Sequence, residues 1–513
     1  IVGGAIGEYN GSGSWLNTVE VTNSVIMGTG NYVGANCGNG SSTTTNMVSR
    51  NNVILGAGIV GGNNGQKGGW TGSNLTSENN IIIATNNLTL CSNREEYKNK
   101  PVTGNNVGGN NGYSGWTTNY NLTSKNNYIR GIDYVGGNIG QVNYYNTSCE
   151  NFTSTGTDQL ISGRNCVGGS IGWTNARAKI LNVSDCQITA TGNYAGGAIG
   201  HSEYTNTAIS NSDNYTVRGV RVSNVTLRGG SYVGGAVGNQ RGTIYGAAVI
   251  NGTTVTGTGT YVGGITGYYT GYTGTNSSYL RSDGYYLWHS YIENSTVQGD
   301  TKVGGITGVL EIGNLQFCNV INTSVTATSA TVGGIVGYYQ NNKLNSIQYK
   351  ATIKDNIIMN TQDGIRVTSK EYAGGLIGAA NKPIKYDGNY RFSNIECNLI
   401  VTDVYATTGS HADMGVSYIE TNGEYGMMQA VYMNNTFVYN GNVLSCSLLD
   451  APTQIAGIYD YTVRDTLPIV TDDDDLDKTK ARYMLITSDE LSKVVTYTMN
   501  KVIYEKKYAF IPI

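Results

Sequence analysis

Residues 232–238 read YVGGAVG, residues 261–267 read YVGGITG and residues 302–308 read KVGGITG. Further copies of this motif begin at Val2, Tyr32, Ile59, Asn106, Tyr134, Cys166, Tyr194, Thr331 and Tyr372, and Asp413 begins a decayed copy. Successive glycine pairs are about 28 residues apart, with insertions of about ten residues in several repeats. A period of this length indicates a solenoid, a propeller or a helical array.

Short alternating segments rich in β-branched residues precede the glycine pairs, for example residues 224–227 (NVTL) and 253–256 (TTVT). Such alternation predicts strands. The repeats lack the 3.6-residue period of helices, and a four-stranded propeller blade needs about 40 residues. We therefore expect an all-β fold, a right-handed parallel β-solenoid of about 12 glycine-rich coils with inserted loops and a non-repetitive C-terminal region.

The motif also predicts local geometry. Because glycine has no Cβ, it permits close backbone approach and positive φ, so each glycine pair is expected to turn a corner. The residue before Val-Gly-Gly forms a column that accepts Lys302 among tyrosines, so this column is expected to face outward. Three tryptophans, Trp70, Trp116 and Trp173, each follow a glycine motif by a few residues and are expected to cover the solenoid wall.

Composition divides the chain into three segments. Residues 1–415 carry the repeats, residues 416–470 are expected to be degenerate last coils or a cap, and residues 471–513 form a charged tail with short strands. In this tail 15 of 43 residues are charged, against 52 of the preceding 470. Its aspartates offer a weak Ca²⁺ candidate, Asp472, Asp474 and Asp477, but the run lacks the glycine and the distal glutamate of an EF-hand loop. A solvated acidic linker is the favoured interpretation, and no metal site is predicted.

The repeats resemble the GLUG-type repeat of bacterial surface adhesins and some secreted peptidases, whose signature is Gly-Gly-hydrophobic-hydrophobic-Gly. The closest copies are residues 375–378 (GLIG) and 334–337 (GIVG), and the resemblance covers roughly residues 1–415. It implies a surface-exposed parallel β-solenoid that serves as a stalk or an adhesive module. Several copies depart from the pattern with polar residues at Asn63, Asn64, Asn110 and Asn111. The resemblance implies no particular ligand.

Charge and motif content argue against several functions. The net charge is −3, so the chain lacks the basic footprint of a nucleic-acid-binding protein, and no apolar window is long enough to cross a membrane. The eight cysteines form no C-x-x-C pair, which leaves surface disulfides open. The initial IVGG matches an activated trypsin-like terminus, but no nucleophile or histidine motif of that family follows. Acidic residues are scattered along the repeats. We predict no cofactor and no enzymatic activity, with a polysaccharide-active enzyme as the remaining alternative.

Two sets of residues are candidates for partner binding or modification. An insertion concentrates aromatic rings that suit sugars or a protein partner, although the same rings could instead shield the outside of the solenoid. These aromatic candidates are Tyr268, Tyr269, Tyr272, Tyr279, Tyr285, Tyr286, Trp288 and Tyr291. N-x-S/T sequons make up the second set, as acceptors for N-glycosylation or as members of an intercoil asparagine ladder. They begin at Asn10, Asn39, Asn74, Asn87, Asn121, Asn146, Asn151, Asn182, Asn214, Asn224, Asn251, Asn276, Asn294, Asn322 and Asn434.

These observations leave three classes of function. We expect an extracellular or cell-surface structural protein of a stalk or filament that self-associates head to tail, because the Ile1 end opens inside a motif with no visible cap. An adhesin that binds glycans or cell-surface proteins through aromatic loops is the alternative, followed by the polysaccharide-active enzyme. No nucleic acid or membrane partner is expected for this segment.

Overall fold

A computed structural model describes residues 1–10, 15–144, 147–203, 215–271, 285–340, 352–360 and 364–380, together with short runs between residues 385 and 443. The chain forms two compact units. The first comprises Ile1–Arg241 and Ala248–Thr258, and the second comprises Gly242–Ala247 and the residues from Gly259 onward. The predicted boundary near residue 415 falls among the short runs, and the predicted tail of residues 471–513 lies outside the described residues.

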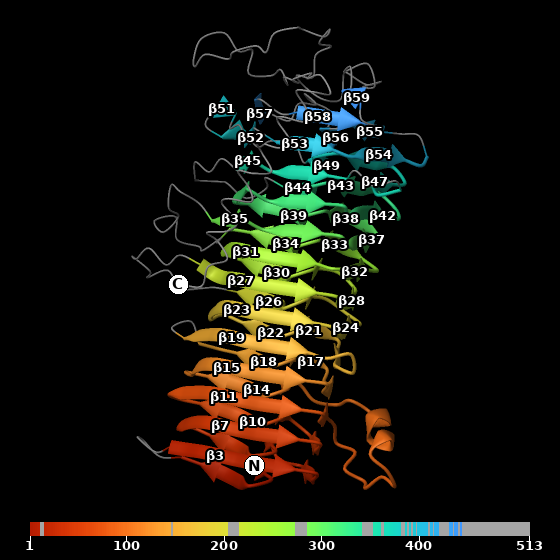
Figure 1. Cartoon of the computed structure of the whole chain (residues 1–513). Coiled ribbons are helices and arrows are strands. Elements are labelled where there is room, and N and C mark those ends of the chain that lie inside the picture. Colours follow the sequence, from red (N-terminus) through yellow and green to blue (C-terminus); the bar gives the residue numbers. More distant parts are fainter. Residues whose placement is uncertain are drawn as a thin grey trace. The chain divides into compact units, whose positions relative to one another are not determined.

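The first unit is a parallel β-solenoid in which every coil contributes one strand to each of four sheets, A to D (Figure 1). Sheet A contains β1 (Val2–Gly3), β5 (Tyr32–Gly34), β9 (Ile59–Gly61), β13 (Val107–Gly108), β17 (Asp133–Gly136), β21 (Asn165–Gly168), β25 (Ala195–Gly196) and β29 (Val233–Gly234). Sheet B contains β2 (Ile6–Tyr9), β6 (Cys37–Gly40), β10 (Asn64–Gly68), β14 (Asn111–Gly115), β18 (Ile139–Val142), β22 (Ile171–Thr174), β26 (Ile199–Glu203) and β30 (Val237–Arg241).

Sheet C of this unit holds the longest strands. They are β3 (Trp15–Thr22), β7 (Thr43–Arg50), β11 (Thr71–Glu78), β15 (Thr118–Lys125), β19 (Ser148–Thr155), β23 (Arg177–Ser184) and β27 (Tyr215–Ser223). Sheet D contains β4 (Val25–Gly28), β8 (Val53–Gly56), β12 (Ile81–Ala84), β16 (Tyr128–Arg130), β20 (Leu160–Gly163), β24 (Gln187–Ala190), β28 (Thr226–Gly229) and β32 (Thr254–Gly257). The expectation of a parallel β-solenoid is confirmed.

The second unit repeats the arrangement with a divided sheet C. Sheet A has β33 (Thr260–Gly263), β38 (Thr301–Gly304), β43 (Thr331–Gly333), β48 (Tyr372–Gly374) and β55 (His411–Asp413), and sheet B has β34 (Thr266–Thr270), β39 (Thr307–Ile312), β44 (Val336–Tyr339), β49 (Ile377–Ala380) and β56 (Val416–Ile419). Sheet D has β37 (Thr296–Gly299), β42 (Ser324–Ala327), β47 (Arg366–Ser369) and β54 (Asp403–Ala406).

Sheet C of the second unit consists of two short parallel rows. One row includes the part of β31 (Thr243–Ile250) that belongs to this unit, then β35 (Tyr286–Trp288), β40 (Asn314–Gln316), β45 (Thr352–Lys354), β52 (Ser393–Glu396) and β57 (Ala430–Met433). The other includes β36 (Tyr291–Glu293), β41 (Asn319–Ile321), β46 (Ile357–Met359), β53 (Leu399–Val401) and β58 (Thr436–Tyr439), to which β59 (Asn442–Val443) pairs antiparallel. Strands β50 (Lys385–Tyr386) and β51 (Asn389–Tyr390) form a small antiparallel pair.

The glycine pair turns the corner between sheets A and B, as predicted, and close approach is the reason. A Cβ on Gly61 would lie 1.8 Å from the carbonyl oxygen of Asn64, and one on Gly136 would lie 2.0 Å from that of Ile139. The valine before the pair points inward and is fully buried in most copies, for example Val60 and Val135. Positive φ falls instead on the residue before this valine, such as Tyr134 at 58°.

The long insertion between β12 and β13 covers the outer face of sheet D. It contains the 3₁₀ helix η1 (Glu95–Asn99), and Tyr97 packs against Val53, Leu55, Ile81 and Ile83. These side chains alternate with inward-facing residues, so without the insertion they would face water. The described residues contain no α-helix, and none of their helices is long and apolar enough to span a membrane.

Candidate functional surfaces

A ladder of buried asparagines runs through the interior of the first unit, directly after the glycine pairs. The Nδ2 atom of Asn63 donates to Oδ1 of Asn110 at 2.6 Å, and Asn110 donates in turn to Asn138 at 2.8 Å. Asn36 makes the equivalent bond to Asn63. Each Nδ2 also donates to a strand carbonyl, as Asn63 does to Thr76 at 2.9 Å. The polar departures from the repeat signature are therefore stacked interior residues with hydrogen-bonded amides.

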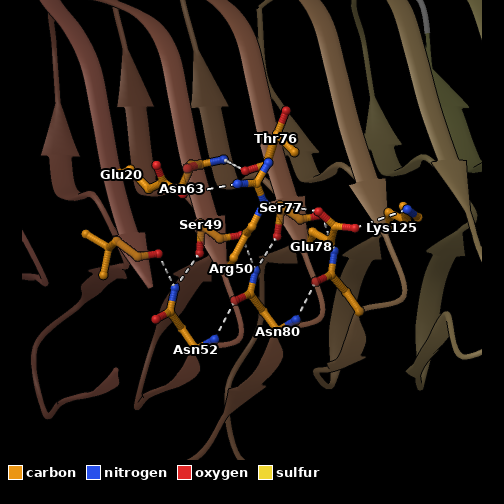
Figure 2. A network of polar contacts seen from close by, with 12 residues as sticks. Glu20, Ser49, Arg50, Asn52, Asn63, Thr76, Ser77, Glu78, Asn80 and Lys125 are labelled. Atoms are coloured by element: carbon orange, nitrogen blue, oxygen red, sulfur yellow. Dashed lines mark hydrogen bonds and ion pairs between the residues drawn. The ribbon is translucent and has the colours of Figure 1, made fainter. Parts of the chain in front are cut away.

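A second buried row occupies the corner between sheets C and D. Figure 2 shows Asn80 donating from Nδ2 to the carbonyl of Ser49 and to Oγ of Ser77, both at 2.9 Å. Its Oδ1 accepts the backbone N–H of Asn52 at 2.8 Å. Asn52 and Asn127 repeat this arrangement in neighbouring coils. One amide thus satisfies two backbone groups of the preceding coil and the serine hydroxyl of its own coil, at a bend where the strand ladder is interrupted.

A third row lies on the exposed face of sheet C, at the fourth residue of the long strands. Asn74 donates to Asn46 and Asn121 donates to Asn74, each at 2.9 Å, and Asn151 donates to Asn121 at 2.6 Å. These residues have φ near 53–59°, the left-handed region that asparagine tolerates. Three sequon asparagines, Asn74, Asn121 and Asn151, thus adopt the ladder that the sequence left open as the alternative to glycosylation.

The other sequons are dispersed. Asn224 donates to Asp185 at 2.8 Å, Asn251 donates to Ser223 at 3.1 Å, and Asn87 accepts the Thr89 hydroxyl at 2.6 Å and Lys100 Nζ at 2.9 Å. Asn39 and Asn10 both donate to Glu8. Asn182 lies within β23, whereas Asn294 directly follows β36 and Asn322 directly follows β41. Asn146, Asn214, Asn276 and Asn434 fall outside the described residues, as do the Ca²⁺ candidates Asp472, Asp474 and Asp477. Glycosylation stays a prediction.

Charged side chains of four consecutive coils form an alternating row on sheet C. Arg50 contacts Glu20 and Glu78, and Lys125 contacts Glu78, each at 3.1 Å (Figure 2). The two cations lower the pKa of Glu78, and the hydrogen bond from Lys125 is the largest cause. Exposed ion pairs contribute little stability each, so this row adds little to the stability of the stack.

The predicted aromatic insertion is only partly described. Tyr272 and Tyr279 lie outside the described residues. Tyr269 is fully buried, and burial raises the pKa of its phenol, so its ring packs inside the coil. Tyr268, Tyr285, Tyr286, Trp288 and Tyr291 are half-buried.

The aromatic contacts of this insertion extend into the next coil. Trp288 stacks on His289 at 5.1 Å between ring centroids, and His289 stacks on Phe317 at 5.0 Å. Phe317 follows β40, which pairs with β35. Sequence reasoning missed Phe317 because it lies one coil beyond the tyrosine-rich run, with no other ring close to it in sequence.

Two of the three tryptophans contradict their predicted role. Trp70 is 65 % exposed and Trp116 is 69 % exposed, so the expectation that they cover the wall is wrong. Both lie at turns between sheets B and C. Trp173 alone is half-buried and meets the edge of Tyr134, with 6.4 Å between ring centroids. Trp15, the first residue of β3, is also exposed.

The described cysteines are thiols rather than disulfides. Cys37, Cys149, Cys166, Cys186 and Cys318 are buried, and Cys91 is half-buried. Burial raises the pKa of Cys37 to about 11 and that of Cys149 to about 12. Because the thiolate is the reactive form, these buried thiols serve as small apolar fillers.

The scattered acidic residues do not gather into a cluster among the described positions. Asp133 pairs with Arg164 at 2.8 Å, and Glu203 pairs with Arg241. No group of three or more His, Cys, Asp and Glu side chains placed to hold a metal ion occurs in the described part of the chain. The asparagine rows and the exposed tryptophan rings are therefore the features from which we argue a function.

Comparisons with known proteins give little more. No protein-family model and no curated protein matches the chain. Among solved structures, the chain is similar to a candidate immunoglobulin A1 protease from Bacteroides ovatus at 16 % sequence identity, over 56 % of this chain and 78 % of that one, with a TM-score of 0.25. A likeness at this level carries no argument about function.

Proposed function

We propose that this chain is an extracellular structural protein, a cell-surface stalk or filament in which stacked coils act as a stiff scaffold. The observation that carries the proposal is the set of side-chain rows that cross from coil to coil in the first unit. The buried row Asn36–Asn63–Asn110–Asn138 is one of them. A scaffold needs many equivalent contacts along one direction, and these rows supply them between successive coils.

Hydrogen bonds in these rows act together. A typical intramolecular bond contributes about 0.5–1.5 kcal/mol, but a buried donor or acceptor left without a partner costs about 1–3 kcal/mol. Sliding one coil past the next would break, at the same time, the bond of each row that joins those two coils. The rows therefore resist shear along the stack more strongly than apolar packing, which is non-directional.

Several features of the prediction enter this proposal. The first is membership of the GLUG-type repeat family, which agrees with the motif. The second is head-to-tail self-association through the solenoid ends, which would extend the scaffold. The third is that the chain carries no catalytic activity. Glycan or protein adhesion through the aromatic insertion is the alternative function. Its described rings are at most half-exposed, which favours the scaffold.

Electron microscopy of the native protein and immunogold labelling of intact source cells test this proposal. We expect label outside the cell envelope and purified particles that are filaments or rods. Label confined to the cell interior would contradict the surface location. Compact particles without an elongated form would contradict the scaffold, and single rods at all concentrations would remove the head-to-tail contact alone.

A further inference from the structure

Two exposed tryptophans and a tyrosine lie on successive coils at the turns between sheets B and C of the first unit. Trp70 follows β10, Trp116 follows β14 and Tyr144 follows β18. These strands are neighbours, since Gly68 pairs with Gly115 and Ser114 pairs with Val142. Trp116 stacks on Tyr144 with 4.5 Å between ring centroids and 11° between ring planes.

The fold itself gives no reason for these rings. Trp70 has φ of 44° and Trp116 has φ of 58°, in the left-handed region that bulky residues avoid because it brings Cβ close to the following carbonyl oxygen. Their exposure means that little of the cost of this conformation returns as buried apolar area. Glycine or asparagine would fit both turns without strain. Positive φ recurs at other bulky residues of the coils, but these two rings combine it with exposure, which is a reason to look for a ligand.

The neighbouring side chains indicate the chemistry of a ligand. The turns of the adjoining coils carry uncharged residues, among them Ser41, Thr117, Asn143 and Asn175, and Asn175 donates to Asn143 at 3.1 Å. Aromatic faces are apolar and slightly negative, so they attract the C–H faces of pyranose rings, while amides and hydroxyls bond sugar hydroxyls. These turn residues carry no charge, so they offer no counter-charge to a charged polymer.

We propose that Trp70, Trp116 and Tyr144, here called the tryptophan corner, form a binding platform for a neutral, unbranched polysaccharide. Strand pairing holds the three turns on neighbouring coils, so the residues lie in a line along the stack, which suits a linear ligand. Tryptophan anchors of a protein contact become covered when the partner binds, so that occupant is one of the outcomes that the test distinguishes. This platform goes beyond the scaffold function and does not depend on it.

The test uses the full chain and its Trp70→Asn/Trp116→Asn double variant, with Leu90→Asn as the matched control. Leu90 is 78 % exposed in the insertion that covers sheet D, away from the B–C turns. Each protein is incubated with insoluble cellulose, chitin and mannan, and run by affinity electrophoresis in soluble laminarin and xylan. We expect binding to at least one polysaccharide, a loss of at least tenfold in the double variant, and wild-type binding by Leu90→Asn.

Thermal unfolding separates binding from folding. Asparagine tolerates positive φ, so the double variant should unfold at a temperature no lower than the wild type. A structural role for the rings predicts the opposite. The proposal is overturned if no polysaccharide binds, or if the double variant binds as well as the wild type. It is also overturned if light scattering shows copies of the chain associating through these rings, because the corner would then be a protein contact.

Discussion

At the scale of the residue, Asn80 is the clearest example of an amide that joins coils. Its side chain makes three buried hydrogen bonds, to Ser49, Ser77 and the N–H of Asn52. Asn80→Ala removes all three and leaves backbone groups without partners, so we expect a loss of about 3 kcal/mol in the free energy of unfolding. Denaturant titration measures it.

The control for this variant is Asn74→Gly in the exposed row. Glycine keeps the positive φ of Asn74, and the lost bonds are replaced by water, so the expected loss is below about 1 kcal/mol. Equal losses in the two variants would show that burial does not set the strength of these rows.

Lys67 is a buried amine whose charge is costly. Its Nζ donates to the carbonyl oxygens of Ser42, Gly68 and Gly69, and burial lowers its pKa to about 7 although the nearby Cys37 opposes the shift. In the unfolded chain this lysine titrates near pH 10.4. Between these values the unfolded state binds more protons, so stability should rise with pH by at most about 1.4 kcal/mol per unit.

The pH window for this test is set by the buried thiols. Burial raises the pKa of Cys37 to about 11 and those of Cys149, Cys166 and Cys186 to about 12, so above about pH 8.5 the unfolded thiols lose their protons first and stability falls as pH rises. The Lys67 effect is therefore measured from pH 7 to 8.5, by denaturant titration of the wild type and Lys67→Met. We expect a positive slope that the variant flattens. Identical slopes would mean that Lys67 keeps its charge in the folded chain.

At the scale of the element, the long strands β3, β7, β11, β15, β19 and β23 of sheet C share a left-handed residue at their fourth position. Asparagine takes this position in β7, β11, β15 and β19, but β23 has Ile180 at φ 53°. A β-branched residue is strained there by about 1–2 kcal/mol. Ile180→Asn should raise the unfolding temperature and extend the row beyond Asn151. A lower unfolding temperature would show that packing of the half-buried isoleucine outweighs the strain.

Part of this geometry could be predicted from sequence. Period-two segments located the strands, and the glycine pair located the A–B corner, because both depend on local residue types. The interior role of Asn63 and Asn110 could not be predicted, since an amide is buried only when a partner in the next coil receives it. The exposure of Trp70 and Trp116 was also missed, because nothing local tells whether a ring folds back on the wall.

At the scale of the whole molecule, the spacing of the glycine pairs is enough to predict a parallel solenoid, because each repeat has room for only a few short strands. The division of the chain at Arg241 was not predicted, because the motif continues through it without a change in composition. Among the described residues, the exposed tryptophans lie only in the first unit, whereas the cation Lys302 lies over the ring of Tyr338 at 3.9 Å in the second. The two units thus share one type of coil but differ in the side chains on its outer face.

Stacked coils contact mainly their immediate neighbours, so damage to one coil should stay local. In Asn80→Ala the lost bonds between coils join those of β7 and β11, while the backbone N–H of residue 80 keeps its bond to Asn127. Hydrogen exchange in the native chain should accelerate in those strands, whereas β23 and β24, which pair with other coils, should keep wild-type protection. Faster exchange throughout the first unit would instead mean that its coils unfold as one cooperative block. The resistance to shear proposed for the scaffold would then depend on the weakest coil rather than on each row separately.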